Sequence, residues 1–233
     1  MVTRLDLGET AVDIVRREVK RVQLTIHPPT GRVRVTAPEH VALETIRLFA
    51  IAKLPWIRQQ QRRLCAQSRE APRDYVDRES HHVWGKRVLL KVVEAKAARV
   101  ELGPRTLILF VRSGTPHGDR EVLLARWYRQ QVRAAAQGLV ERWAGDLGIA
   151  LQGIHVRRMK TKWGSCNPKR RTIRLNTELA KKPRDCLEYV VAHELVHLHE
   201  PTHGPRFVAL LDRLLPQWRQ TRDALNRLPL APD

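Results

Sequence analysis

The chain has 233 residues, of which 42% are hydrophobic, so it can bury one large or two small cores and is not intrinsically disordered. Its formal net charge is +19 and its pI is about 11.0. Nothing in it approaches the roughly eighteen consecutive apolar residues of a membrane-spanning helix, and its start lacks the apolar core of a signal peptide. Three widely spaced cysteines fit a reducing compartment better than a disulfide scaffold, so we expect a cytoplasmic protein with no membrane partner.

The first half of the chain is rich in strand patterns and contains one long helix pattern. Residues 43–67 are typical of a helix that Pro55 should kink or divide. Short runs of alternating or β-branched apolar residues predict strands at 12–17, 19–27, 32–36, 81–84, 87–93, 98–102 and 107–111. The turn-forming residues 113–118 are the best candidate for a boundary. We therefore expect a strand-rich N-terminal domain over residues 1–115.

The second half has a different organisation, in which helices dominate. An amphipathic helix is predicted from about residue 120 to 147, and a shorter helix over 205–215. Between them, strands at 154–159 and 172–175 flank a basic loop. The expected fold class is α+β, with residues 116–233 forming a second domain.

One motif in this second half indicates a metal-binding site. Histidines four residues apart, such as His193 and His197, lie on one face of a helix and can bind the same metal ion. Glu194 beside the first histidine can reach water at that metal, which is the arrangement of zinc hydrolases. The surrounding residues 187–198 read as a buried helix, and such a helix would not normally carry two histidines and a glutamate without partners for them.

The third metal ligand has more than one candidate. His203 follows just after the helix and would leave one coordination position open, as in a catalytic zinc site. His199 should point to another side of the helix, and Asp212 is the main acidic competitor because no glutamate follows Glu200. The His203 spacing is that of the metzincins. However, their midway glycine is Glu200 here, and no methionine lies downstream to form their Met-turn.

Positive charge is densest directly before the motif. Residues 157–184 contain 11 Lys and Arg and a single acid, Glu178. This segment has two interpretations: an ordinary solvated basic surface, or a positive rim that attracts nucleic acid, a nucleotide or an acidic substrate. Trp163 is its only aromatic residue, which gives little support for a platform that stacks single-stranded bases.

A second motif lies inside the basic segment. It runs Met159-Lys160-Thr161-Lys162-Trp163-Gly164-Ser165-Cys166-Asn167, and it is followed by Ile173-Arg174-Leu175-Asn176, by the His193–His197 helix, and by His203 with Phe207. This ordered set resembles the YgjP-like metallopeptidase family, which is related to the SprT and Wss1 zinc proteases. The family usually has an asparagine before the third histidine, where this chain has Thr202.

The resemblance implies specific roles for these residues. It implies a minimal zincin-like catalytic domain, Zn²⁺ as cofactor on His193, His197 and His203, and Glu194 as general base. Gly164 permits a turn or a close backbone approach, Ser165 could donate a hydrogen bond to substrate, and Cys166 is expected to pack rather than to bind metal. The candidate substrate-binding residues are Lys162, Trp163, Gly164, Ser165 and Arg206. The candidate oxyanion donors are Tyr189, Arg206 and Lys162.

Three functions compete on this basis. The first is a zinc metallopeptidase that uses metal-activated water and acts on a peptide or protein. The second is a metal-dependent nucleoside triphosphate pyrophosphatase, a role attached to the family, although the chain lacks the carboxylate set that usually holds magnesium and phosphates. The third is a basic nucleic-acid-binding protein with a structural zinc. The open three-histidine site beside Glu194 favours the first.

Overall fold

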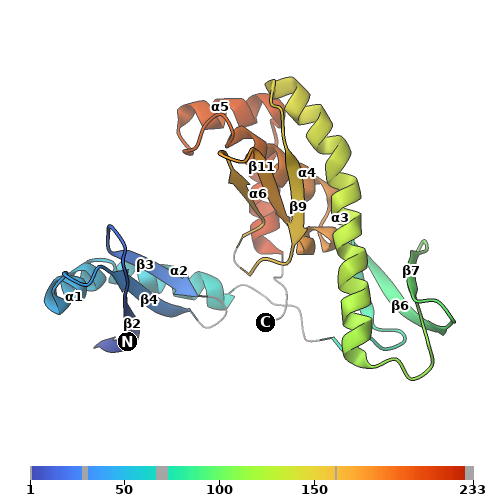
Figure 1. Cartoon of the computed structure of the whole chain (residues 1–233), viewed down its shortest axis with the longest axis horizontal. Coiled ribbons are helices and arrows are strands. Elements are labelled where there is room, and N and C mark those ends of the chain that lie inside the picture. Colours follow the sequence, from blue (N-terminus) through green and yellow to red (C-terminus); the bar gives the residue numbers. More distant parts are fainter. Residues whose placement is uncertain (1, 28–30, 67–72, 161, 229–233) are drawn as a thin grey trace. The chain divides into compact units, whose positions relative to one another are not determined.

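The computed structural model of the chain describes residues 2–27, 31–66, 73–160 and 162–228 (Figure 1). Its elements belong to two compact units, which divide between Arg69 and Glu70. The class is α+β, as the mixture of strand and helix patterns predicted. Among the described residues, no helix is both long and apolar enough to cross a bilayer.

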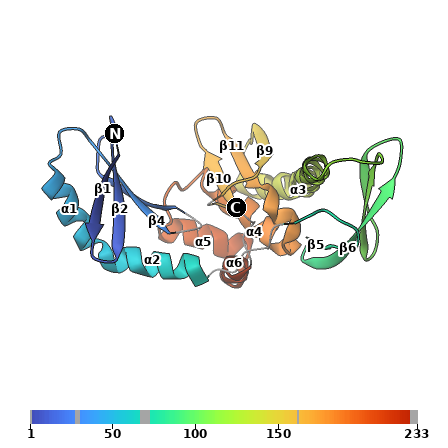
Figure 2. The same cartoon turned by 90° about the horizontal axis from the view of Figure 1, so that it is seen from below.

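The first unit is a four-stranded sheet with two helices on one face (Figure 2). The strands β1 (Val2–Leu7), β2 (Thr10–Arg16), β3 (Gln23–His27) and β4 (Arg32–Ala37) lie in the order β1-β2-β4-β3, and only β2 and β4 are parallel. Alternate residues of β2 and β4 are fully buried against the helices, as the period-two pattern requires. The helices α1 (Leu43–Ala52) and α2 (Leu54–Ala66) are separated at Lys53, because Pro55 cannot continue the hydrogen-bond ladder of α1.

The second unit is organised around one long helix. α3 (His117–Leu147) packs at its start against the sheet of β5 (Ser80–Val83), β6 (Lys86–Glu94), β7 (Arg99–Leu102) and β8 (Thr106–Val111), and farther along against β9 (Gly153–Arg157) (Figure 1). The remaining elements are β10 (Gly164–Asn167), β11 (Thr172–Asn176), the 3-10 helix η1 (Thr177–Lys181), α4 (Arg184–Val196), α5 (Pro205–Leu214) and α6 (Trp218–Arg227). One hydrophobic core, together with the partly buried residues packed against it, includes all of these elements except β10.

The division into units differs from the domain boundary expected at residues 115 and 116. Leu107 and Leu109 of β8 are fully buried in the same cluster as Leu124 and Trp127 of α3. Burying these strand residues on α3 removes their apolar surface from water, so the strands and the helix share one core. The turn at residues 113–118 therefore joins two parts of one unit.

Two elements near the motif were not expected. Residues 164–167, predicted as part of a basic loop, form the strand β10, which pairs antiparallel with β11 from Gly164↔Leu175 to Asn167↔Thr172. The helix α6 was missed because its Arg-rich composition conceals an apolar face, of which Trp218 and Leu225 are buried. Both elements contribute to the walls of the candidate site.

Candidate metal centre

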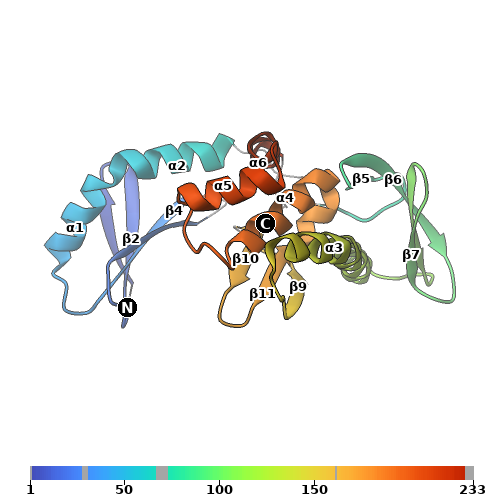
Figure 3. The ribbon, with the colours of Figure 1, turned by 90° about the horizontal axis from the view of Figure 1, so that it is seen from above.

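The central element of the site is α4, a helix whose middle and end are almost entirely buried. Figure 3 shows α4 between the strands β10 and β11 on one side and the helices α5 and α6 on the other, and α4 contacts all four. Pro183 precedes the helix and Asp185 lies in its first turn, where a negative charge is favourable. This packing fixes His193 and Glu194 in the helix and His197 at its C-terminal cap.

The three histidines of the motif meet at one point. One ring nitrogen from each of His193, His197 and His203 lies within 4.8 Å of the others, and the Nε2 atoms of His193 and His203 are 3.2 Å apart. Two nitrogens bound at about 2.0–2.1 Å to one tetrahedral zinc would lie roughly 3.3 Å apart. Beneath the cluster, the buried ring of Phe207 packs on the imidazoles with centroid distances of 4.7–5.0 Å.

The protonation of two of the three imidazoles, those of His193 and His197, is also suited to binding a metal. Burial, reinforced by the neighbouring histidines, lowers the pKa of His193 to about 3, and burial lowers the pKa of His197. A neutral imidazole keeps a lone pair for a metal, and a partner on its Nδ1 orients the ring. The Nδ1 of His197 donates to the Glu200 carbonyl at 3.1 Å, and the Nδ1 of His193 lies 3.5 Å from the Tyr189 hydroxyl.

Glu194 lies beside the cluster in an apolar setting. Its side chain is 6% exposed, and burial raises the pKa of its carboxyl to about 7, although the positive charge of Lys162 acts in the opposite direction. Gly164 of β10 lies directly against this carboxyl. A Cβ on Gly164 would be 2.6 Å from Glu194 Oε1 and 2.8 Å from Val190 Cγ1. The groups closest to Gly164 are therefore side chains, whereas the sequence suggested a turn or the close approach of another backbone.

This contact predicts a strong effect of a single methyl group. Gly164→Ala should lower the free energy of unfolding by about 1–3 kcal/mol and displace Glu194, because a buried helix cannot make room. Gly138→Ala is the matched control, since a Cβ there, on α3, meets nothing within 4 Å and should be neutral or stabilising by up to about 1 kcal/mol. Chemical denaturation of the two variants measures the difference, and equal stabilities would contradict this account of Gly164.

The loop that leads into β10 is held by one side chain. Asn176, at the end of β11, donates from Nδ2 to the carbonyls of Met159 and Lys162, both at 2.8 Å. Its Oδ1 accepts from the N–H of Met159 and of Glu178, both at 3.2 Å, and its own N–H donates to the Trp163 carbonyl at 2.8 Å. Asn176 was part of the sequence motif, but only the fold reveals that it clamps the loop.

A cleft of about 280 Å³ opens beside the cluster. His193, Glu194 and three of the candidate substrate-binding residues, Lys162, Trp163 and Gly164, line it. The remaining wall consists of Tyr189, Val190, Arg222, Leu225 and Asn226, the last three of which belong to α6. The sequence did not predict α6, so the contribution of this helix to the cleft was not expected either.

The other candidates lie outside the lining of this cleft. Ser165 is half-buried in β10 opposite Arg174. Arg206 is exposed and pairs with Glu200 at 3.1 Å. Among the suggested oxyanion donors, Lys162 and Tyr189 do line the cleft, and the Tyr189 hydroxyl is on the Nδ1 side of His193.

Comparison with known proteins identifies the family of the chain. A family model described as YgjP-like, metallopeptidase domain, matches residues 20–228. The chain belongs to the YgjP-like metallopeptidase family. No curated protein matches it.

Two solved structures are similar over part of the YgjP-like chain. The metallopeptidase zymogen abylysin of Pyrococcus abyssi has 21% identity and a TM-score of 0.37, over 41% of this chain and 99% of abylysin. The zymogen jannalysin of Methanocaldococcus jannaschii has 24% identity and a TM-score of 0.35, over 39% of this chain and 86% of jannalysin. Family membership supports a metal-dependent hydrolase.

The rivals for the third ligand of this YgjP-like site have other partners. Asp212 accepts from Trp218 Nε1 at 2.8 Å and pairs with Arg219, and these contacts hold its pKa below the usual range. His199 hydrogen-bonds through Nε2 to the Leu147 carbonyl at the end of α3, at 2.9 Å. Among the described residues, the group able to hold a metal contains only the three histidines of the motif.

Neither described cysteine of the YgjP-like chain has the character of a nucleophile. Cys166 is a half-buried free thiol in β10, and Cys186 is a buried free thiol in α4. Burial raises the pKa of each to about 11, so both remain protonated near neutral pH. The side chain of Cys65 lies outside the described side chains.

Proposed function

We propose that the protein is a zinc-dependent peptidase in which His193, His197 and His203 hold the ion and Glu194 is the general base. The observation that carries the proposal is the meeting of three imidazoles beside a buried carboxyl. Imidazole ligands suit zinc, and three protein ligands leave a coordination position for chemistry. All of these residues lie in the second unit, which we propose to be the catalytic one.

When bound, zinc would supply a Lewis acid that polarises the scissile carbonyl and lowers the pKa of water to about 7. The Glu194 carboxylate would then accept a proton from the attacking water and return it to the leaving amine. The absence of a side chain at Gly164 leaves room for the carboxylate, and the burial of Glu194 limits its contact with bulk water. Lys162, whose charge acts on Glu194, is our candidate for stabilising the developing oxyanion.

The strand β10 suggests how a peptide would bind. Within its sheet β10 is an edge strand, paired on one side with β11. An extended peptide can add to such an edge through main-chain hydrogen bonds, and it would then pass Gly164 and Glu194. Side chains of that peptide would enter the cleft between Trp163 and α6. The proposed substrate is accordingly an extended peptide or an unfolded segment of a protein.

A parallel assay separates this function from its alternatives. The zinc-loaded chain should cleave casein or a quenched peptide, and should release no pyrophosphate from nucleoside triphosphates. Turnover of a nucleoside triphosphate without peptide cleavage would favour the pyrophosphatase. Salt-sensitive DNA binding with no turnover of any substrate would favour the nucleic-acid-binding alternative.

A further inference from the structure

A second cavity, of about 90 Å³, lies within the second unit, between α3, β5 and η1. It shares no lining residue with the cleft beside the histidines. Its charged lining residues are four basic and two acidic ones: Arg73, Arg129, Arg158, Lys181, Glu121 and Glu178. Positive charge therefore exceeds negative charge around a small concave space, which concentrates the field on any anion inside it.

Part of the positive charge of the basic segment 157–184 lies at this cavity. Arg158 and Lys181 belong to the basic segment 157–184, and both line this cavity. Lys181 also forms an ion pair with Glu178 at 2.8 Å, so the carboxylate of Glu178 compensates the positive charge of Lys181. The proposed peptidase chemistry uses neither of these basic residues.

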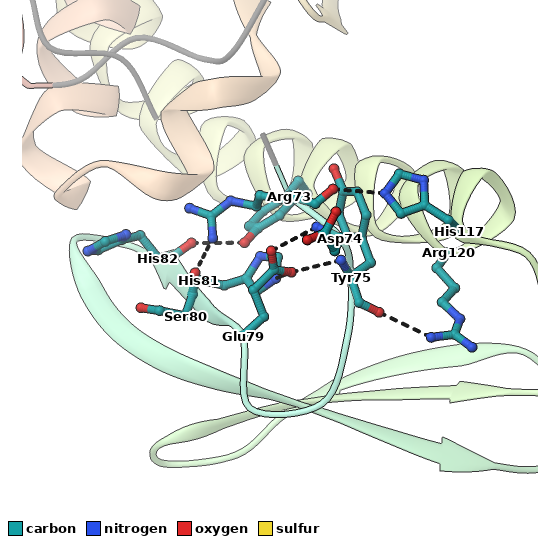
Figure 4. A network of polar contacts seen from close by, with 10 residues as sticks. Arg73, Asp74, Tyr75, Glu79, Ser80, His81, His82, His117 and Arg120 are labelled. Atoms are coloured by element: carbon teal, nitrogen blue, oxygen red, sulfur yellow. Dashed lines mark hydrogen bonds and ion pairs between the residues drawn. The ribbon is translucent and has the colours of Figure 1, made fainter. Parts of the chain in front are cut away.

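One wall of the cavity is held in a strained conformation. Tyr75 has φ 52°, in the left-handed region, although it is not a glycine. Three side chains fix the backbone around it (Figure 4): Glu79 accepts the Tyr75 N–H at 2.9 Å, Arg120 donates to the Tyr75 carbonyl at 3.3 Å, and His117 bonds the Arg73 carbonyl at 2.8 Å. Strain that neighbouring contacts maintain in this way is common at ligand clamps.

The cavity also has polar groups whose hydrogen bonds are not all made. Thr177 is 6% exposed, and its hydroxyl has no hydrogen-bond partner among the described residues. Arg129 likewise has no hydrogen bond or ion pair within the described part of the chain. A buried hydroxyl that makes no hydrogen bond is unfavourable, so a ligand that accepts from both groups would be stabilised.

We propose that this cavity binds a phosphate-sized oxyanion, held by Arg129 and Arg158 with the hydroxyl of Thr177. Guanidinium groups match the oxygen geometry of phosphate through paired hydrogen bonds. A cavity of about 90 Å³ exceeds several-fold the space that one water requires, so it can take a phosphate group. The source of that group is either free inorganic phosphate or a phosphate monoester whose remainder lies outside the cavity.

The site can be tested on the full chain by isothermal titration calorimetry. Inorganic phosphate and AMP are each titrated at constant ionic strength, into the zinc-loaded chain and into the chelator-treated chain. We expect saturable binding that survives chelation, because the cavity does not include the histidines. Tighter binding of phosphate identifies the free anion as the ligand, and tighter binding of AMP identifies a monoester.

Matched variants locate the binding site. Arg129→Gln removes an exposed charge at the cavity and should weaken binding about tenfold or more. Arg126→Gln removes an exposed charge one turn earlier on the same helix, outside the lining, and should leave the Kd unchanged. The absence of binding, its loss on chelation, or an equal effect of both substitutions would overturn the proposal.

Discussion

Glu194→Gln should slow peptide cleavage by orders of magnitude while leaving zinc binding intact. Glutamine has nearly the same shape as glutamate but cannot accept the proton from the attacking water. Loss of a general base reduces the rate by roughly 10²–10⁴-fold. The ligands of the ion are His193, His197 and His203 in our account, so the metal should remain bound at its original stoichiometry.

The test of this variant combines steady-state kinetics with metal analysis. The kcat for a quenched peptide should fall, and the zinc content of the purified variant should match that of the parent chain. Thermal unfolding should also be similar, since a neutral amide suits the buried position of Glu194. A Glu194→Gln enzyme with parental kcat would exclude the general-base role.

The second large effect is expected from the third histidine. His203→Ala should weaken zinc binding by more than about 100-fold, because loss of even an indirect partner of a zinc ligand costs about 10–100-fold. His203 is exposed and lies outside the helices, so its removal should barely change folding. Competition with a chromogenic chelator measures the affinity.

Asp212→Ala is the matched comparison, because Asp212 was the acidic rival for the same role. Its carboxylate is bound to Trp218 and Arg219, so its loss should leave zinc affinity unchanged. The reverse pattern, with affinity lost in Asp212→Ala and retained in His203→Ala, would show that the third ligand is wrongly assigned.

The sequence predicted the chemical part of the candidate site better than its walls. The helical spacing of His193 and His197 predicts a shared helix face from local geometry alone, and the structure has His193 in the last turn of α4 and His197 at its C-terminal cap. Gly164 was expected at a turn or at a close backbone approach, but the group that lies against it is the side chain of Glu194, thirty residues away, and only the fold identifies it. The clamp formed by Asn176 is likewise a product of tertiary contacts.

The errors have a common physical origin. β10 was read as a loop because its four residues are too few to show a period, and it exists through pairing with β11. The boundary expected at residue 115 rested on turn-forming residues, which do not reveal which faces are buried together. Leu107 and Leu109 pack with α3 in one core, so the strands and the helix belong to the same unit. No local sequence pattern indicates this packing.

The most direct test of the central claim is a zinc titration of the metal-free chain followed by peptide cleavage. We predict that activity rises linearly with added zinc and reaches a plateau at about one ion per chain, the capacity of a single three-histidine site. Peptide cleavage that is independent of zinc, or one bound ion per chain without any peptide cleavage, would contradict the assignment of this protein as a zinc-dependent peptidase.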